Sequence, residues 1–241
     1  MSNLTDFIGG SGSSLAPSGA KYSIFDDRFV KFTSSQNITG LSGKWYCILS
    51  GGGGAGAGYH YSNGASGDVT GGGSGFIQTF EVTLDAASSN ALVIGAGGIG
   101  ADNVNGSKGG TSSFMGFSAL GGDGGVKDGT TPSNGFKKGG VYTSTINIPA
   151  ETFNKYGSIF TLYPKQIGGT PSLFSSLHAG GGGASILATG GNGTAGQQTN
   201  SIYGGNGVLG SGGGGCTNSY SYPGIGGNGG DGFLIMIKLG D

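Results

Sequence analysis

Charged residues are scarce in this chain, and their scarcity excludes several classes of protein. Lys, Arg, Asp and Glu make up 10% of the 241 residues, and the formal net charge is −1. The chain has a single arginine, Arg28, and a pI near 6.0, so it lacks the basic surface that nucleic-acid binding requires. No apolar run approaches the roughly 18 residues of a membrane span. We therefore expect no nucleic-acid partner and no membrane insertion.

Cysteine is nearly absent as well. Cys47 and Cys216 are isolated in the sequence, so they encode neither a disulfide framework nor a CxxC metal site. We expect two reduced, buried thiols, with a bridge between them as the alternative. The first 20 residues have neither a basic region nor an apolar stretch of the kind found in secretory signals.

Glycine, in contrast, supplies 60 of the 241 residues, about a quarter of the chain against about 7% in ordinary proteins. Such a share is typical of disordered, low-complexity segments. Disordered chains, however, carry high net charge and few aromatic residues, whereas aromatics are 10% of this chain. The composition therefore indicates a folded protein that is built in an unusual way.

Short apolar and aromatic runs bounded by turn residues predict β-strands, and no stretch shows a helical period over three turns. One short helical turn is expected at residues 172–179. The expected strands lie in KYSIFDDRFVKFTSS (21–35), GKWYCILS (43–50), FIQTFEVTL (76–84), ALVIG (91–95) and FLIMIKL (233–239).

Three glycine blocks, at residues 50–58, 179–185 and 210–216, separate these strands at irregular spacing. A glycine-dense backbone readily extends as polyproline II, which has no internal hydrogen bonds. Its N–H and C=O groups must find partners if they are buried, so such segments are expected to lie side by side. The predicted fold class is all-β with extensive polyglycine II or irregular extended segments, a glycine-rich β sandwich or bundle with little or no helix.

Two glycine motifs resemble binding sites. Residues 95–100 (GAGGIG) satisfy the dinucleotide fingerprint, but the following DNVNGSKGGTSS cannot begin the helix that the fingerprint needs. GGNGGDGFL, with Asp231, fits one copy of a calcium-binding nonapeptide that works only in tandem. We interpret both as structural glycine and expect no metal and no cofactor.

No catalytic constellation stands out. His60 and His178 are expected in loops far apart in the sequence. The chain has only two glutamates, Glu81 and Glu151, and Glu81 alternates with apolar neighbours as on a solvated strand face. We therefore expect a protein that is not an enzyme.

Aromatic residues placed among Gly, Ser and Asn are the remaining candidates for recognition. This composition is typical of adaptable binding loops, and aromatic rings also stack on sugars. The same rings could instead cap glycine segments and shield their hydrogen bonds, and the sequence leaves both interpretations open. The candidates are Tyr59, His60, Tyr61, Tyr142, Tyr163, Phe174, Tyr203, Tyr220 and Tyr222.

The order of these elements resembles the glycine-rich domain of bacteriophage tail-fibre and tail-tip proteins. The resemblance covers roughly residues 44–241, and it is looser toward the tip adhesins of T-even-type phages. It rests on WYCILSGGGGAGAG, GGGSGFIQTFEVTL, VIGAGGIG, GGTSSFMGFSALGGDGG and GGNGGDGFLIMIKL, in this order. Residues 141–178 depart from it, because they are longer and poorer in glycine, and we expect an inserted recognition loop or an oligomer contact there.

The resemblance implies a virion protein of the phage tail, assembled in the host cytoplasm, whose polyglycine II segments form a bundle and whose loops contact a host surface glycan or outer-membrane protein. It also implies a homo-oligomer, with a trimer favoured. Residues 1–20 are expected to anchor the chain to other tail proteins through Leu4, Phe7 and Ile8, with 21–241 as the glycine-rich domain. The alternative is an architectural virion protein, such as a head-decoration or tail-associated protein, that does not bind a receptor.

Overall fold

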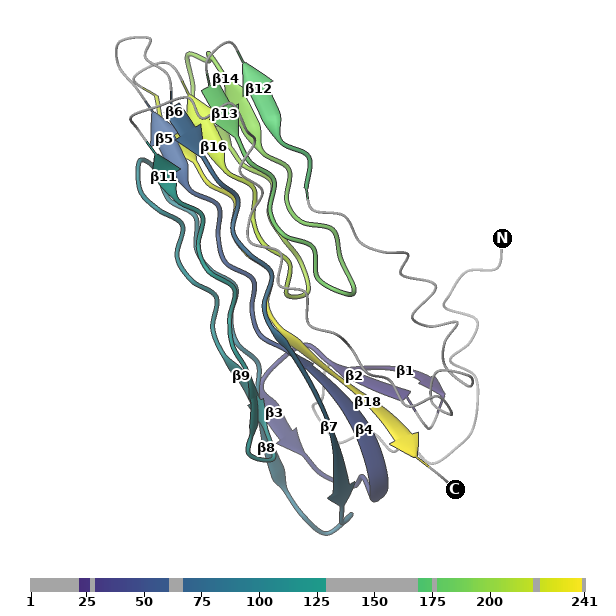
Figure 1. The fold of residues 1–241 in the computed structure, drawn as a ribbon. Coiled ribbons are helices and arrows are strands. Elements are labelled where there is room, and N and C mark those ends of the chain that lie inside the picture. Colours follow the sequence, from purple (N-terminus) through teal and green to yellow (C-terminus); the bar gives the residue numbers. More distant parts are fainter. Residues whose placement is uncertain are drawn as a thin grey trace, which may run out of the picture.

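The part of the chain that the structure describes consists of β-strands and extended segments. The computed structural model describes residues 22–26, 29–60, 67–128, 169–174, 177–218 and 222–239, and it contains no helix within them. The strands gather at two ends of an elongated molecule, and long extended segments run between the ends (Figure 1). The predicted all-β fold class is therefore confirmed.

One end is a sandwich of two antiparallel sheets. Its larger sheet has the order β1-β2-β18-β4-β7 and its smaller sheet the order β10-β9-β8-β3. The strands predicted from the sequence all lie here. The larger sheet contains β1 (Tyr22–Asp26), β2 (Phe29–Phe32), β18 (Phe233–Leu239), β4 (Gly43–Ser50) and β7 (Ile77–Leu84), and the smaller contains β10 (Phe117–Ala119), β9 (Ser112–Phe114), β8 (Asn90–Val93) and β3 (Gln36–Ile38).

The main hydrophobic core fills the space between these sheets. In β7, Phe80 and Val82 are buried, whereas Glu81 between them is exposed and forms an ion pair with Lys44. This is the period-two pattern of a strand with one face in a core. The core also contains Trp45 and Phe114, and its cluster draws on both sheets.

A second cluster lies on the opposite face of the larger sheet. Ile235 and Ile237 of β18 contribute to it together with Tyr46 and Leu187. β18 is therefore buried on both faces, which explains its uninterrupted apolar sequence FLIMIKL.

The other end of the molecule, which we call the distal end, is built from strands of two or three residues. They form sheets of order β11-β6-β13-β12, β14-β16-β5 and β15-β17. The strands are β5 (Gly58–His60), β6 (Gly67–Val69), β11 (Lys127–Asp128), β12 (Ser172–Phe174), β13 (Leu177–Ala179), β14 (Thr194–Gly196), β15 (Ile202–Tyr203), β16 (Cys216–Asn218) and β17 (Gly224–Ile225).

The helical turn predicted at residues 172–179 is wrong. β12 and β13 form an antiparallel pair in this range, and β13 also pairs in parallel with β6. Leu177 and Ala179 are buried on one face while His178 alternates with them, as in a strand. The neighbouring β6 supplies backbone partners that are far away in the sequence, and these override the weak local preference.

Extended glycine segments connect the two ends and form the body of the molecule. In residues 51–58, successive N–H groups donate in rotation to three different neighbouring segments. Gly51, Gly54 and Ala57 donate to residues 70–76. Gly52, Ala55 and Gly58 donate to residues 104–110, and Gly53 and Gly56 donate to residues 227–230. This rotation every three residues is the hydrogen-bonding signature expected of polyproline II segments lying side by side.

The central segment 51–58 has six neighbouring segments. Besides the three that it donates to, it accepts hydrogen bonds from residues 98, 122–125 and 213–216. Residues 211–216 are surrounded in the same way, by 51–57, 72–75, 180–183, 191–194, 205–208 and 227–230. The bonds thus arrange the bundle in three layers, with both central segments in the middle layer.

Glycine is required in the bundle because the backbones approach too closely for a side chain. A Cβ atom added to Gly54 would lie 2.0 Å from the carbonyl oxygen of Asp123, and one on Gly56 would lie 2.0 Å from that of Gly214. These distances are far inside van der Waals contact. Glycine content therefore follows directly from the packing of the segments.

The predicted anchoring segment 1–20, with Leu4, Phe7 and Ile8, lies outside the described residues, as do residues 141–168 of the expected insertion. The described end of that range belongs to the fold. Gly169 donates to the carbonyl of Gly182 in the bundle, and residues 172–174 form β12.

Candidate functional site at the distal end

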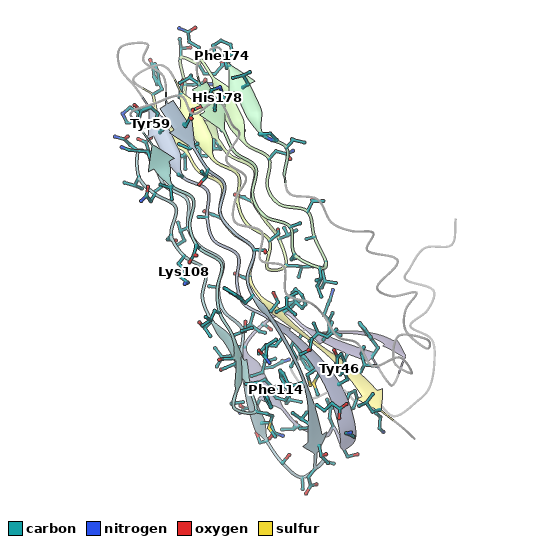
Figure 2. All side chains as sticks on the ribbon, viewed as in Figure 1. Tyr46, Tyr59, Lys108, Phe114, Phe174 and His178 are labelled. Carbon is teal, nitrogen blue, oxygen red and sulfur yellow. The ribbon has the colours of Figure 1, made fainter. Side chains whose placement is uncertain are left out.

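The distal end gathers the candidate recognition residues that the structure describes. Tyr61, Tyr142, Tyr163 and Tyr220 lie outside the described residues. The five others come from separate parts of the sequence, and the short distal sheets bring their strands together. Side chains are few along the glycine bundle and gather at its two ends (Figure 2).

Tyr59 packs inside the distal end. It is 5% exposed and forms a small cluster with Ala57, Val69 and Ala179 between two of the distal sheets. Lys127 Nζ lies 5.4 Å from the centre of its ring. Of the two interpretations open for the aromatics, Tyr59 fits the one in which the ring shields glycine backbone, and it offers little surface to a partner.

Three other aromatics are exposed. Phe174 on β12 is 43% exposed, Tyr203 on β15 is 63% exposed, and Tyr222 next to β17 is 46% exposed. β15 and β17 pair with each other and contact β16, so all three rings belong to the distal end. Exposed aromatic rings on a rigid support are the kind of group that dominates recognition surfaces.

His60 lies in strand β5, not in a loop as predicted, and it is paired with an acidic residue. Its Nδ1 lies 2.9 Å from Oδ1 of Asp102, which also accepts a hydrogen bond from the backbone N–H of Gly224. Both side chains are partly exposed. The pair ties β5 to two segments that are more than 40 residues away in the sequence.

His178 also lies in a strand, β13, and has a similar partner. Its Nδ1 lies 2.6 Å from Oδ1 of Asp68 on the adjacent strand β6. The two residues are direct partners in the parallel register, which places their side chains on the same face of the sheet. Asp68 and Asp102 could not be identified from local sequence, because neither lies near its histidine in the chain.

A protein-family model matches a range of the chain that includes both ends of the molecule. This model, described as a glycine-rich domain, matches residues 31–237, from β2 of the sandwich through the distal end to β18. The chain belongs to the glycine-rich domain family. No curated protein matches the chain.

Both cysteines of this glycine-rich domain are free and buried, as expected, one at each end. Burial raises the pKa of Cys216 to about 12, and the same cause raises the pKa of the Cys47 thiol further. Cys216 Sγ lies 3.3 Å from the carbonyl oxygen of Ile202, which accepts its weak hydrogen bond. Both thiols are therefore protonated and unreactive near neutral pH.

The two glycine motifs lie against each other inside the glycine-rich domain. Asp231 Oδ1 accepts a hydrogen bond from the N–H of Gly97, and Gly229 donates to the carbonyl of Gly98. A Cβ atom on Gly97 would lie 2.0 Å from the carbonyl oxygen of Gly229. These contacts give both motifs a role in bundle packing.

Within the described ranges, no group of three or more His, Cys, Asp or Glu side chains is placed to hold a metal ion. In the same ranges, no helix is long and apolar enough to cross a membrane.

Proposed function

We propose that this glycine-rich domain is a structural protein of a bacteriophage virion that acts as a tail-fibre or tail-tip adhesin. In this proposal the distal end binds the host cell surface and the chain has no enzymatic role. The resemblance to phage tail glycine-rich domains motivates the proposal. The observation that carries it is the exposure of Phe174, Tyr203 and Tyr222, which lie on or beside strands of the distal end, away from the apolar sandwich.

The construction of the bundle supports this role. A binding surface loses affinity when its side chains must be ordered on contact, and a rigid support reduces that loss. Here the segments under the distal strands are held by backbone hydrogen bonds to as many as six neighbours. The loops between the distal strands can then differ in sequence without disturbing the bundle, as expected of an adhesin.

Adhesion of the purified chain to bacteria tests the proposal. The fluorescently labelled protein should bind intact host cells and should reduce adsorption of the phage that carries it. The double variant Phe174→Ala, Tyr222→Ala should bind about tenfold more weakly, since two exposed rings are lost.

Val208→Ala provides the matched control. Val208 is 56% exposed, but it lies at the turn before Leu209, which packs on the sandwich. This variant should adhere like the unaltered chain. A protein that is incorporated into virions and yet neither binds cells nor blocks adsorption would contradict adhesion and identify an architectural virion protein instead.

A further inference from the structure

One outer layer of the glycine bundle presents a regular face, which we call the amide face. Three neighbouring segments form it, and Gly207 and Gly229 hold them together by donating to the carbonyls of Asn228 and Gly98. In each segment the outward positions recur every third residue, a rise of about 9 Å. These positions are Tyr203 and Asn206, then Ile225, Asn228 and Asp231, then Ala96, Ile99 and Asp102.

Two asparagines on this face have a defined orientation. Asn206 Oδ1 accepts a hydrogen bond from the N–H of Asn228 at 2.9 Å, and Asn228 Oδ1 accepts one from the N–H of Gly100 at 2.8 Å. Each amide oxygen is therefore engaged with the backbone of the adjacent segment. The Nδ2 groups have no partner within the described residues, and both side chains are exposed. They remain as hydrogen-bond donors toward solvent.

An aromatic ring and a carboxylate lie at the distal edge of the same face. Tyr203 pairs with Ile225 in the parallel register, and Ile225 forms a bridge with Asp102. Two strand spacings, about 10 Å in all, therefore separate Tyr203 from Asp102. His60 and the N–H of Gly224 hold the carboxylate of Asp102, so the acceptor has a fixed position.

We propose that the amide face binds a neutral oligosaccharide. The apolar C–H face of a sugar ring would stack on Tyr203, whose ring face carries partial negative charge. Sugar hydroxyl groups would accept hydrogen bonds from Asn206 and Asn228 and donate one to Asp102. The charged residues on the face, Asp102 and Asp231, are both acidic, so the face disfavours an anionic glycan.

This inference names the ligand class for the distal binding site and rests on the proposed function for its biological role. It also places the glycan contact on the amide face, which includes Tyr203, one of the three exposed aromatics of the distal end.

A glycan array carrying neutral, sialylated and phosphorylated oligosaccharides tests the proposal with the full chain. The chain should bind the neutral oligosaccharides and should not bind the anionic ones. Tyr203→Ala should weaken binding about tenfold or more, a loss of about 1.4 kcal/mol, whereas Tyr203→Phe should keep the stacking surface and most of the binding.

Asn228→Asp separates recognition from folding. The substituted carboxylate can still accept the hydrogen bond from Gly100, so the melting temperature should stay close to that of the unaltered chain, but the Nδ2 donor is lost and glycan binding should weaken. Leu173→Ala, which removes an exposed apolar side chain of β12 away from the face, should bind the array unchanged.

Several outcomes would overturn the inference: no neutral oligosaccharide is bound, anionic glycans are preferred, or Tyr203→Ala binds as well as the unaltered chain. Adhesion to cells that persists in Tyr203→Ala but is abolished by protease treatment of the cells would point to a protein receptor and also overturn it, while the proposed adhesion would stand. Binding to the array without any adhesion to cells would support the site and contradict the adhesin.

Discussion

Most of the glycines that the structure describes are needed for close approach and not for unusual backbone angles. Among the described residues, the glycines with positive φ are Gly40, Gly43, Gly116 and Gly210. The bundle glycines instead lie where any Cβ atom would overlap a neighbouring carbonyl group. Each glycine costs more conformational entropy on folding than other residues do, and the dense backbone hydrogen bonding offsets that cost.

Alanine at a central bundle position should be severely destabilising. In Gly54→Ala, the new Cβ would lie 2.0 Å from the carbonyl oxygen of Asp123, and the middle layer would have to move. We expect a loss of about 3 kcal/mol or more in the free energy of unfolding, at the upper end of overpacking costs. Urea denaturation followed by fluorescence measures it.

Gly196→Ala is the matched control for this prediction. Gly196 lies in β14, and a Cβ atom there would have its nearest contacts at 3.7 Å, both with side chains. This variant should be neutral or more stable by up to about 1 kcal/mol, because alanine restricts the unfolded chain. Equal effects of the two substitutions would show that close approach is not the reason for glycine at position 54.

Two turns each place a large side chain in the left-handed region of backbone conformation. We expect a substitution by asparagine to stabilise the fold at one turn and to destabilise it at the other. Met115 has φ 51° before Gly116 with φ 83°, and Leu209 has φ 47° before Gly210 with φ 76°. Asparagine tolerates this conformation better. Met115 is 41% exposed, so Met115→Asn should raise the melting temperature by about 1–4 °C.

Leu209→Asn should instead lower the melting temperature, because Leu209 packs against the second hydrophobic cluster. The backbone gain is then smaller than the loss of apolar contact. Calorimetry on both variants checks the prediction. A decrease for Met115→Asn would mean that the left-handed conformation is not what limits this turn.

At the scale of the element, polar side chains complete the hydrogen bonding of the outer segments. A segment in the middle layer finds backbone partners all around, whereas an outer segment has N–H groups with no neighbouring backbone. Side-chain oxygens accept from several of these groups. In each of the following pairs the backbone N–H of the first residue donates to a side-chain oxygen of the second: Gly97 and Asp231, Gly100 and Asn228, Ile99 and Ser107, Val126 and Thr70, Lys127 and Asn105, and Thr170 and Asn192.

Removing one of these acceptors should have a moderate cost. Asn192→Ala leaves the N–H of Thr170 without its acceptor at 3.0 Å, and we expect a loss of about 1 kcal/mol, as for a removed helix cap. Asn192→Asp keeps an acceptor oxygen and should retain most of the stability. Hydrogen exchange at Thr170 should accelerate in the alanine variant alone, and unchanged exchange there would contradict the capping role.

At the scale of the whole molecule, the sandwich and the bundle are joined by continuous segments. β4 passes directly into the central segment at Gly51, Phe76 leads into β7, and Gly232 leads into β18. The strands in the core of the sandwich therefore continue without a break into the glycine segments that reach the distal end. We infer that the two ends unfold together.

The two cysteines test this inference, because Cys47 lies in the sandwich and Cys216 at the distal end. At pH 8 both thiols are buried and protonated, because burial raises the pKa of each well above that pH. Iodoacetamide should modify neither until urea unfolds the protein, and then both at the same urea concentration. Modification of Cys216 at lower urea than Cys47 would show that the ends unfold separately.

Because both thiols are buried, we expect the stability of the fold to decrease as the pH rises above the ordinary pKa of a thiol. Their pKa values are raised in the folded state, so the unfolded chain loses these protons first as the pH rises. Their contribution to stability is complete below about pH 8.5 and is lost progressively toward pH 12. The urea midpoint should be lower at pH 10 than at pH 7, and the difference should shrink in Cys216→Ala.

Much of the architecture could be predicted from local pattern. Alternation in FIQTFEVTL and the apolar run FLIMIKL identified β7 and β18, and the glycine blocks indicated extended segments in contact. Two predictions failed because they depended on distant partners. Residues 172–179 are strands because β6 lies beside β13, and His60 and His178 lie in strands that acquire Asp102 and Asp68 from elsewhere in the chain.

The sequence by itself determined that this protein is β-rich, that glycine is its building material, and that its two thiols are isolated. These properties follow from residue volume, backbone freedom and period-two alternation, which are local. The tertiary structure decided which segments are neighbours, that Tyr59 is buried while Tyr203 is exposed, and that Asn206 and Asn228 share a face with Tyr203. Those outcomes depend on backbone hydrogen bonds between segments distant in the sequence, and a glycine segment carries no side chain that could specify its neighbours in advance.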